Sequence, residues 1–298
     1  MIVILNRAAG GADVKAEESD ATIRELFQSH GADPRIVNPD EQKDLAALAR
    51  EAAEGTEGTV VAGGGDGTIS AVASALADSG KTLGVLPLGT LNHFAKDLHI
   101  PLDMPGAIET IMRGNSAAVD LGEVNGRIFI NNSSLGLYPR MVANREAQQE
   151  QLARGKWWAF VWAALRAVRL FPFLNLNIKV EEKQLARRTA FLFIGNNEYE
   201  MAGFNLGGRT CLNAGKLGLY LTHRTGRFGL IRLAFRALIG RLEQAKDFEV
   251  YCVPEATIET RKPSLLVATD GEVTRVETPL HYRIRPAALR VLVPQEIG

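Results

Sequence analysis

Residues 59–68 read TVVAGGGDGT, an apolar, β-branched run that leads directly into a glycine-rich loop. Residues 68–79 continue with a helical pattern. A strand, a glycine loop and a helix N-terminus in succession bind anions, because glycines let backbone N–H groups approach phosphate oxygens and the helix dipole favours negative charge. The loop is not a Walker A loop, since no Gly-Lys-Ser/Thr follows, nor the dinucleotide fingerprint, since Thr68 replaces its last glycine. The stretch therefore predicts a phosphate site in an α/β fold.

Asp66 is the informative residue of this loop. A carboxylate among phosphate-binding amides would repel the ligand unless it held a cation or a substrate hydroxyl, so Asp66 favours phosphoryl transfer over simple binding. The alternative is a tight turn in which the glycines adopt positive φ and Asp66 caps the helix. The glycine run by itself favours this alternative, and the neighbouring motifs reverse the preference.

Further candidate residues follow the other predicted strands. Residues 86–98 read LPLGTLNHFAKDL and again join a strand to a helix, residues 6–11 read NRAAGG after the first strand, and Asn38 ends the second strand as a weaker candidate. Loops at the carboxyl ends of parallel strands share one crevice. The residues that we expect to face one phosphate-bearing ligand are Asn6, Arg7, Gly10, Asn38, Gly63, Gly64, Gly65, Asp66, Gly67, Thr68, Gly89, Thr90 and Asn92.

The first 115 residues alternate short β-branched runs with helical stretches, which predicts an α/β domain with an open, mostly parallel sheet. The expected strands are 2–5, 35–37, 59–62 and 83–86. The expected helices are 14–29, 41–54 with Asp40 as its cap, and 68–79.

From residue 119 onward β-structure dominates. Asn125-Gly126 stands between strand-like runs at 119–124 and 127–131, the strongest short signal for a hairpin. Further expected strands are 176–180, 189–194, 217–221, 248–253, 257–260, 265–268, 273–276, 281–284 and 289–293. So many short strands predict a β-sandwich domain with helical insertions at about 141–171 and 227–246, so we expect domains at 1–118 and 119–285.

The bulk composition agrees with two soluble domains. The chain has 298 residues, of which 46% are apolar and 23% charged. Residues 1–126 hold 9 Lys and Arg against 19 Asp and Glu, whereas the remainder holds 25 against 15. A basic second half favours contact with an anionic membrane surface or another polyanion, and the alternative is that the opposite charges steady the contact between the halves.

Two features bear on location. The only cysteines, Cys211 and Cys252, lack metal-ligand spacing and favour a reducing compartment. The opening residues MIVILNR lead us to expect no secretory leader, and the longest apolar run, 157–165, is far shorter than the roughly 20 residues that span a bilayer. We expect a cytoplasmic protein, peripheral at the inner face of the membrane.

The glycine loop, the segment from Pro87 to Ala95, the opening Asn6…Gly10 and the late Asp270-Gly271-Glu272 together resemble the bacterial diacylglycerol-kinase-like lipid kinases, relatives of sphingosine and ceramide kinases. The resemblance covers essentially the whole chain. The Gly-Gly-Asp-Gly core is shared with NAD kinases and phosphofructokinases, whereas the Gly-Thr-x-Asn-x-Phe-Ala segment is much more specific.

The resemblance implies an active site in a cleft between a nucleotide-binding domain and a β-sandwich. ATP with Mg²⁺ would bind to Gly64–Thr68, Thr90 and Asn92. Asp66 would bind the cation or the substrate hydroxyl. Asp270 or Glu272 would be the general base. The last strand would return to the first domain, so that residues from about 286 to 298 belong there.

Asp270-Gly271-Glu272 has a second interpretation, because Asp-Gly between two strand-like runs is a favoured hairpin turn. A turn does not forbid catalysis, since catalytic groups often occupy loops on a rigid scaffold. Which carboxylate acts is left open, and only one of them need point inward.

One stretch departs from the resembled family. The family usually has an Asp-Gly pair in the stretch that here reads LNAGKLG, residues 212–218, where it helps to hold a structural Mg²⁺. Ala214 cannot ligate a metal, although Asn213 could supply a weak oxygen ligand and Lys216 could replace the charge. We therefore expect this metal site to be lost and leave the metal ligands unassigned.

Two segments could meet a lipid. Residues 154–171 hold all three Trp interleaved with four cations, and residues 227–241 form a second basic helix; both patterns suit a headgroup interface, with core packing as the alternative. The favoured function is an ATP-dependent lipid kinase that contacts the membrane transiently through its basic second half. A kinase of a soluble substrate such as NAD and a non-catalytic regulator are the alternatives. No nucleic-acid partner is expected, and a homodimer is left open.

Overall fold

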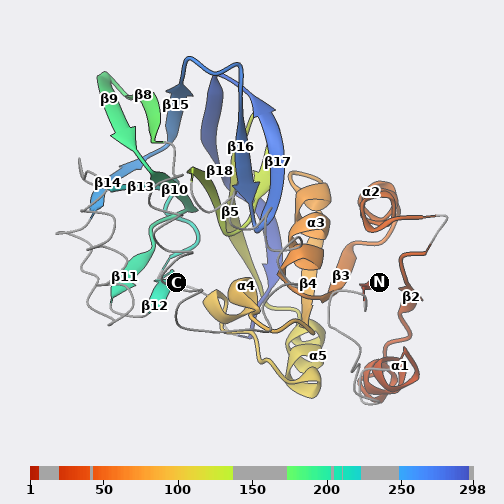
Figure 1. Cartoon of the computed structure of the whole chain (residues 1–298). Coiled ribbons are helices and arrows are strands. Elements are labelled where there is room, and N and C mark those ends of the chain that lie inside the picture. Colours follow the sequence, from red (N-terminus) through yellow and green to blue (C-terminus); the bar gives the residue numbers. More distant parts are fainter. Residues whose placement is uncertain are drawn as a thin grey trace, which may run out of the picture.

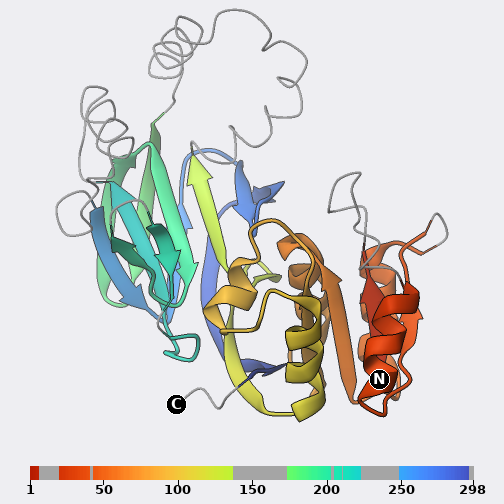
Figure 2. The ribbon, with the colours of Figure 1, turned by 90° about the horizontal axis from the view of Figure 1, so that it is seen from below.

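The computed structural model describes residues 1–6, 20–40, 43–136, 173–202, 205–209, 211–222 and 248–294. An α/β part and a β-sandwich part are joined by strands that run through both (Figures 1 and 2). The predicted fold class, an N-terminal α/β domain with a mostly parallel sheet followed by a C-terminal β-sandwich domain, is confirmed. The helical insertions predicted at 141–171 and 227–246 lie outside the described residues, as do Arg7 and Gly10.

The α/β part contains four neighbouring parallel strands in the order β2-β1-β3-β4. The strands are β1 Ile2–Leu5, β2 Arg35–Val37, β3 Thr59–Gly64 and β4 Thr82–Pro87. The helices are α1 Asp20–Ser29, α2 Leu45–Glu54, α3 Asp66–Leu76, α4 His93–Asp97 and α5 Met104–Arg113. Helices α2 and α3 pack together on one face and α1 contacts α5 on the other (Figure 1), which explains why β1, β3 and β4 are almost continuously apolar.

Two predicted helices need corrected bounds, and one helix was missed. Helix α2 begins at Leu45 and not at 41, because Asp44 is its cap and accepts a hydrogen bond from Ala47 N at 2.7 Å. Asp40 instead accepts from Lys43 N in the preceding turn. Helix α3 begins at Asp66, two residues before the prediction. Helix α5 was not predicted, although Asp103 caps it and Gly114 ends it in the left-handed conformation, signals that could have found it.

The β-rich part consists of two facing sheets and a small two-stranded one. The sheet of the α/β part continues beyond β4 through β18, β15, β8 and β9. A second sheet, with the order β14-β13-β10-β7-β16-β17, packs against this continuation. The strands are β5 Ser116–Val124, β6 Arg127–Phe129, β7 Asn132–Gly136, β8 Leu174–Val180, β9 Lys183–Thr189, β10 Phe191–Asn196, β11 Glu200–Ala202, β12 Asn205–Gly208, β13 Leu217–Thr222, β14 Phe248–Val253, β15 Glu255–Glu259, β16 Ser264–Thr269, β17 Glu272–Glu277 and β18 Leu280–Leu292.

Several strand predictions differ from the structure. Strands β7, β9, β11 and β12 were missed, and the strand predicted at 189–194 begins only at Phe191. The Thr189 side chain closes a turn there, since its hydroxyl donates to Phe191 O at 2.7 Å and accepts from Phe191 N at 3.2 Å. The strands predicted at 281–284 and 289–293 are one strand, β18, because β5 pairs beside it on both sides of an irregularity between Arg285 and Leu289.

Strands β5 and β18 connect the two hydrophobic cores. Leu280, Tyr282 and Ile284 of β18 lie in the core of the sandwich, whereas its later residues Leu289 and Val291 lie in the core of the α/β part. Arg290 and Val291 also pair in parallel with β4. The later part of β18 thus packs with the first domain.

Candidate active site

The two predicted glycine loops lie against each other at the carboxyl ends of β3 and β4. Leu88 N donates to Gly64 O at 3.0 Å. A Cβ added to Gly89 would lie 2.5 Å from Gly65 Cα, so the backbones approach too closely for a side chain. The two loops are therefore in contact at one edge of the sheet.

Asn6 joins the first strand to the glycine loop. Its backbone N–H donates to Gly63 O at 2.8 Å, and its side-chain amide donates to Thr68 Oγ1 at 3.1 Å. Thr68 is buried, and a Cβ on Gly64 would lie 2.6 Å from Thr68 Oγ1. The side chains of Asn6 and Thr68 thus hold the loop in shape from behind.

Asp66 is the first residue of α3, and the interpretation of Asp66 as the helix cap is wrong. Gly65 occupies the cap position, and no side chain caps this helix end. The backbone N–H groups of Thr68 and Ile69 donate to Gly65 O. Asp66 Oδ1 is buried and has no hydrogen-bond partner in the described part of the chain. A buried carboxylate oxygen without a donor is costly, so this atom is suited to a cation or a ligand hydroxyl.

The loop before α4 is shaped by Asn92, which has a left-handed backbone conformation (φ 49°). Its Oδ1 accepts from Gly89 N at 3.0 Å, and its Nδ2 donates to Pro87 O and Gly89 O at 3.2 and 2.8 Å. The amide of Asn92 is therefore used within the loop, whereas Thr90 is exposed at its tip.

Asp270 enters this region from the second domain. It and Gly271 both have positive φ, 48° and 89°, and form the two-residue turn between β16 and β17, so the hairpin interpretation is correct. The Asp270 carboxylate nevertheless points toward the first domain, because Ser70 of α3 donates to its Oδ2 at 2.5 Å. Glu272, two residues later, is exposed at the start of β17.

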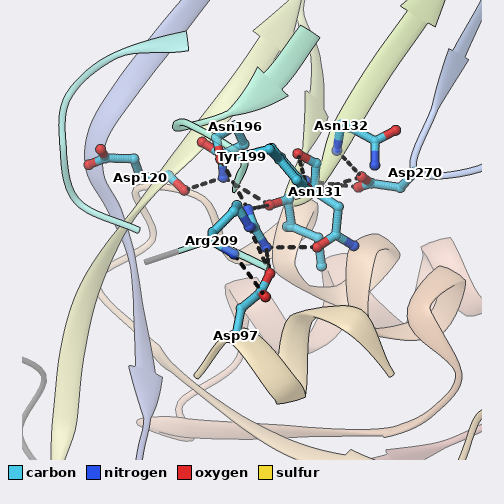
Figure 3. Close-up of polar contacts among 9 residues, drawn as sticks. Asp97, Asp120, Asn131, Asn132, Asn196, Tyr199, Arg209 and Asp270 are labelled. Atoms are coloured by element: carbon cyan, nitrogen blue, oxygen red, sulfur yellow. Dashed lines mark hydrogen bonds and ion pairs between the residues drawn. The ribbon is translucent and has the colours of Figure 1, made fainter. Parts of the chain in front are cut away.

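Four donors surround the Asp270 carboxylate. Besides Ser70, three successive backbone N–H groups donate to it: Ile130 to Oδ2 at 2.8 Å, and Asn131 and Asn132 to Oδ1 at 2.9 and 3.0 Å (Figure 3). Burial raises the pKa of the Asp270 carboxyl above its ordinary value, and these hydrogen bonds pull the pKa partly back.

Asn38 lies away from these groups. It is exposed, and its side-chain amide donates to Asp20 Oδ2 at the start of α1, at 3.0 Å. The structure thus brings together Asn6, the loops around Asp66 and Thr90, and Asp270, but not Asn38 or Glu272.

Sequence reasoning missed a buried ion pair that joins the two domains. Arg209 follows β12, and its guanidinium lies against Asp97 at the end of α4, with an Nη2–Oδ2 distance of 2.7 Å (Figure 3). The Arg209 side chain is 0% exposed and that of Asp97 is 8% exposed. Asp97 was part of the segment at 86–98, but no local pattern marks Arg209, because its partners come from distant parts of the chain.

The loop at 212–218, where the resemblance implies a structural Mg²⁺, contains no carboxylate side chain. Ala214 carries no ligand atom, and its N–H donates to Asn197 Oδ1 at 3.1 Å. Gly215 N donates to Asp120 Oδ2 at 2.7 Å, and Asp120 Oδ1 accepts from Ala287 N at 2.9 Å. Within the described ranges no three His, Cys, Asp or Glu side chains gather as metal ligands.

The two replacements considered for the lost ligand do not face the loop interior. Lys216 and Asn213 are both exposed, and Asn213 Oδ1 accepts from Cys211 Sγ at 2.9 Å.

In the part of the chain that the structure describes, no helix is both long and apolar enough to cross a bilayer.

Two domain families match this chain. The diacylglycerol kinase catalytic domain matches residues 1–124, and the YegS C-terminal NAD kinase beta sandwich-like domain matches residues 139–293. The second match spans more than half of the chain. The chain belongs to the diacylglycerol-kinase-like family, in which these two domains follow one another.

Curated relatives agree with this assignment. An uncharacterized protein of Synechocystis sp. is 26% identical over 312 residues, which cover 99% of this chain and 70% of the relative. The diacylglycerol kinase of Staphylococcus aureus (strain MRSA252) is 35% identical over 136 residues, which cover 45% of this chain and 42% of that enzyme. The match with the staphylococcal enzyme thus covers less than half of its length.

Solved structures share the fold. The crystal structure of a diacylglycerol kinase from Bacillus anthracis strain Sterne has a TM-score of 0.69 at 20% identity, covering 98% of this chain and 96% of that one. A second crystal structure from the same organism has a TM-score of 0.75 at 23% identity, covering 99% and 98%. At these identities the likeness shows the fold alone.

Proposed function

We propose that this chain is an ATP-dependent lipid kinase, which transfers the γ-phosphoryl group of ATP to a hydroxyl of a diacylglycerol-like or related lipid. The observation that carries the proposal is the buried, unpartnered Oδ1 of Asp66 at the N-terminus of α3, beside two glycine loops in contact. An anion-binding loop that also contains an unsatisfied carboxylate oxygen suits phosphates accompanied by a cation. Membership of a kinase family supports the same reaction.

The triphosphate would lie on the glycine loop and the first turn of α3. Helix α3 is 11 residues long and lacks a side-chain cap, so its first N–H groups and its dipole are available to an anion. Thr90, exposed at the tip of the neighbouring loop, would contact the same ligand. Asp66 would hold Mg²⁺, which when bound neutralises charge on the phosphates.

Asp270 is the better candidate for the proton acceptor. Its Oδ2 already accepts a hydrogen bond from one hydroxyl, that of Ser70 on the same helix as Asp66. Burial raises its pKa, and a carboxylate with a raised pKa is a stronger base toward a lipid hydroxyl. Glu272, by contrast, is exposed at the start of β17.

A soluble substrate is the second candidate, because the family that matches the second domain is named for its likeness to the β-sandwich of NAD kinase. Labelled ATP and Mg²⁺ would be supplied with vesicles containing diacylglycerol, with ceramide or sphingosine vesicles, and with NAD. The proposal expects labelled product in the organic phase for at least one lipid. Labelled NAD without any labelled lipid would support the second candidate, and no labelled product at all would contradict both.

A further inference from the structure

The guanidinium of Arg209 is fully enclosed by acceptors from both domains. Nε donates to Asp97 Oδ2 at 2.7 Å, and Nη1 donates to Ile130 O at 2.7 Å and to Asn196 O at 3.1 Å. Nη2 donates to Asn131 Oδ1 at 2.8 Å and lies 2.7 Å from Asp97 Oδ2. Four of the five N–H groups of the guanidinium thus donate hydrogen bonds, and Nη2 also lies within ion-pair distance of the Asp97 carboxylate. We call Asp97, Ile130, Asn131, Asn196, Tyr199 and Arg209 the junction cluster.

One cation faces one anion in this cluster. Tyr199 lies beside the guanidinium, with 5.3 Å between Arg209 Cζ and the ring centroid, and its hydroxyl donates to Asn131 O at 3.0 Å. Burial raises the pKa of Tyr199 to about 12, so the ring stays neutral near pH 7. A buried Arg–carboxylate pair is tolerated only when its remaining polar atoms are hydrogen-bonded, and here they are.

The junction cluster touches both halves of the proposed site. Asp97 is the last residue of α4, the helix that follows the loop of Gly89 and Thr90. Ile130 O and Asn131 Oδ1 accept hydrogen bonds from the guanidinium. The backbone N–H groups of the same two residues donate to the Asp270 carboxylate (Figure 3). Arg209 therefore connects the helix that follows the Gly89 loop with the backbone segment that holds Asp270.

Hydrogen bonds hold the described loop that follows Arg209. Asp120 and Asn197 accept from Gly215 N and Ala214 N, so the oxygen-bearing side chains next to this loop already serve as acceptors for its amide groups. The Mg²⁺ that the family resemblance implies for this loop does not fit these residues.

We propose that Arg209 supplies the fixed positive charge that fastens the two domains of this chain without a divalent metal, and that it acts as a positioning residue for the active site. The metal-free junction stands independently of the proposed kinase function, whereas the positioning role rests on it.

The first experiment measures the thermal unfolding temperature of the full chain after EDTA treatment and with excess MgCl₂. The Asp66→Asn background removes the candidate catalytic cation site from the comparison. We expect the unfolding temperature to be the same in both conditions. A drop of several degrees in EDTA that Mg²⁺ reverses would overturn the proposal.

The second experiment compares Arg209→Met, Asp97→Asn and the double variant. Arg209→Met leaves the Asp97 carboxylate buried without its partner, so we expect the unfolding temperature to fall by roughly 10 °C. The double variant should recover part of this loss, because no uncompensated charge remains. If Arg209→Met does not fold, Arg209→Lys and the double variant carry the same comparison. An unchanged unfolding temperature in Arg209→Met, or in Arg209→Lys where that variant stands in for it, would overturn the proposal.

The third experiment separates positioning from mere stability. Loosening Ile130–Asn132 weakens the hydrogen bonds that lower the Asp270 pKa, so the acidic limb of the kcat–pH profile should move to higher pH in Arg209→Met. Ile23→Ala in the core of α1 is a destabilised control that should leave this limb unmoved. Equal limbs in both variants would contradict the positioning role and leave the metal-free junction to the unfolding data.

Discussion

Three carboxylates that the sequence marks as candidates have three different environments. Asp66 has a buried oxygen without a donor, Asp270 has four donors, and Glu272 is exposed. The sequence left open which of Asp270 and Glu272 acts as the base, because alternation along a hairpin does not reveal how a turn is placed against another domain. At this scale the hydrogen-bond partners, and not the residue types, distinguish the roles.

Asp66→Asn should raise the free energy of unfolding by about 1 kcal/mol, because it removes the charge from a buried oxygen that has no donor. Chemical denaturation with urea measures the change. Asp103→Ala is the matched control, since Asp103 caps α5 and its loss should cost about 1 kcal/mol. A loss of stability in Asp66→Asn as large as that of Asp103→Ala would contradict the account of Asp66.

Asp270→Asn should lower kcat by about 10³-fold or more, whereas Glu272→Gln should stay within about twofold of the parent. In the parent, kcat should fall as the pH is lowered through the raised pKa of Asp270, because a protonated carboxyl cannot accept the substrate proton. Steady-state rates across pH with saturating ATP check both statements. The reverse ranking of the two variants would assign the base to Glu272.

At the scale of elements, the site depends on how closely two loops approach. Helices α3 and α4 follow adjacent parallel strands. Gly65 and Gly89 let the backbones of the two loops before these helices come into contact. The sequence predicted that these loops share one edge, because the order of strand, loop and helix is local. It did not predict that the Asn92 amide is used within its own loop, which depends on a left-handed backbone at that residue.

Gly89→Ala should separate the loops, because its Cβ would lie 2.5 Å from Gly65 Cα. We expect the KM for ATP to rise by about tenfold and the unfolding free energy to fall by about 1–3 kcal/mol. Gly58→Ala, whose Cβ would meet nothing within 4 Å, is the control and should change neither quantity appreciably. Equal KM values for the two variants would show that contact between the loops is not needed for nucleotide binding.

At the scale of the molecule, the two domains share strands and are not independent units. Strand β18 contributes Tyr282 to one core and Val291 to the other, and Asp270 and Arg209 add polar contacts between the domains. The fold class and most of the helices and strands could be predicted from hydrophobic patterning and glycine turns. The merging of two predicted strands into β18 and the Arg209–Asp97 pair could not, because both arise from contacts between residues far apart in the chain.

Because β5 and β18 belong to both cores, the chain should unfold in one cooperative transition. Differential scanning calorimetry should show a single peak whose calorimetric and van't Hoff enthalpies agree. A fragment of residues 1–118 should not fold by itself, since β4 would lose its pairing with β18 and the core would lose Leu289 and Val291. Two separated peaks, or a folded fragment, would contradict the shared-strand description.

The most direct test of the account is phosphoryl transfer from γ-labelled ATP to lipid in mixed vesicles by the parent chain and by Asp66→Asn, both shown to be folded. We predict labelled lipid with the parent and a loss of about 10³-fold or more with Asp66→Asn. Labelled lipid formed equally by both proteins, or by neither, would contradict the central claim that Asp66 and the glycine loops form the phosphoryl-transfer site of a lipid kinase.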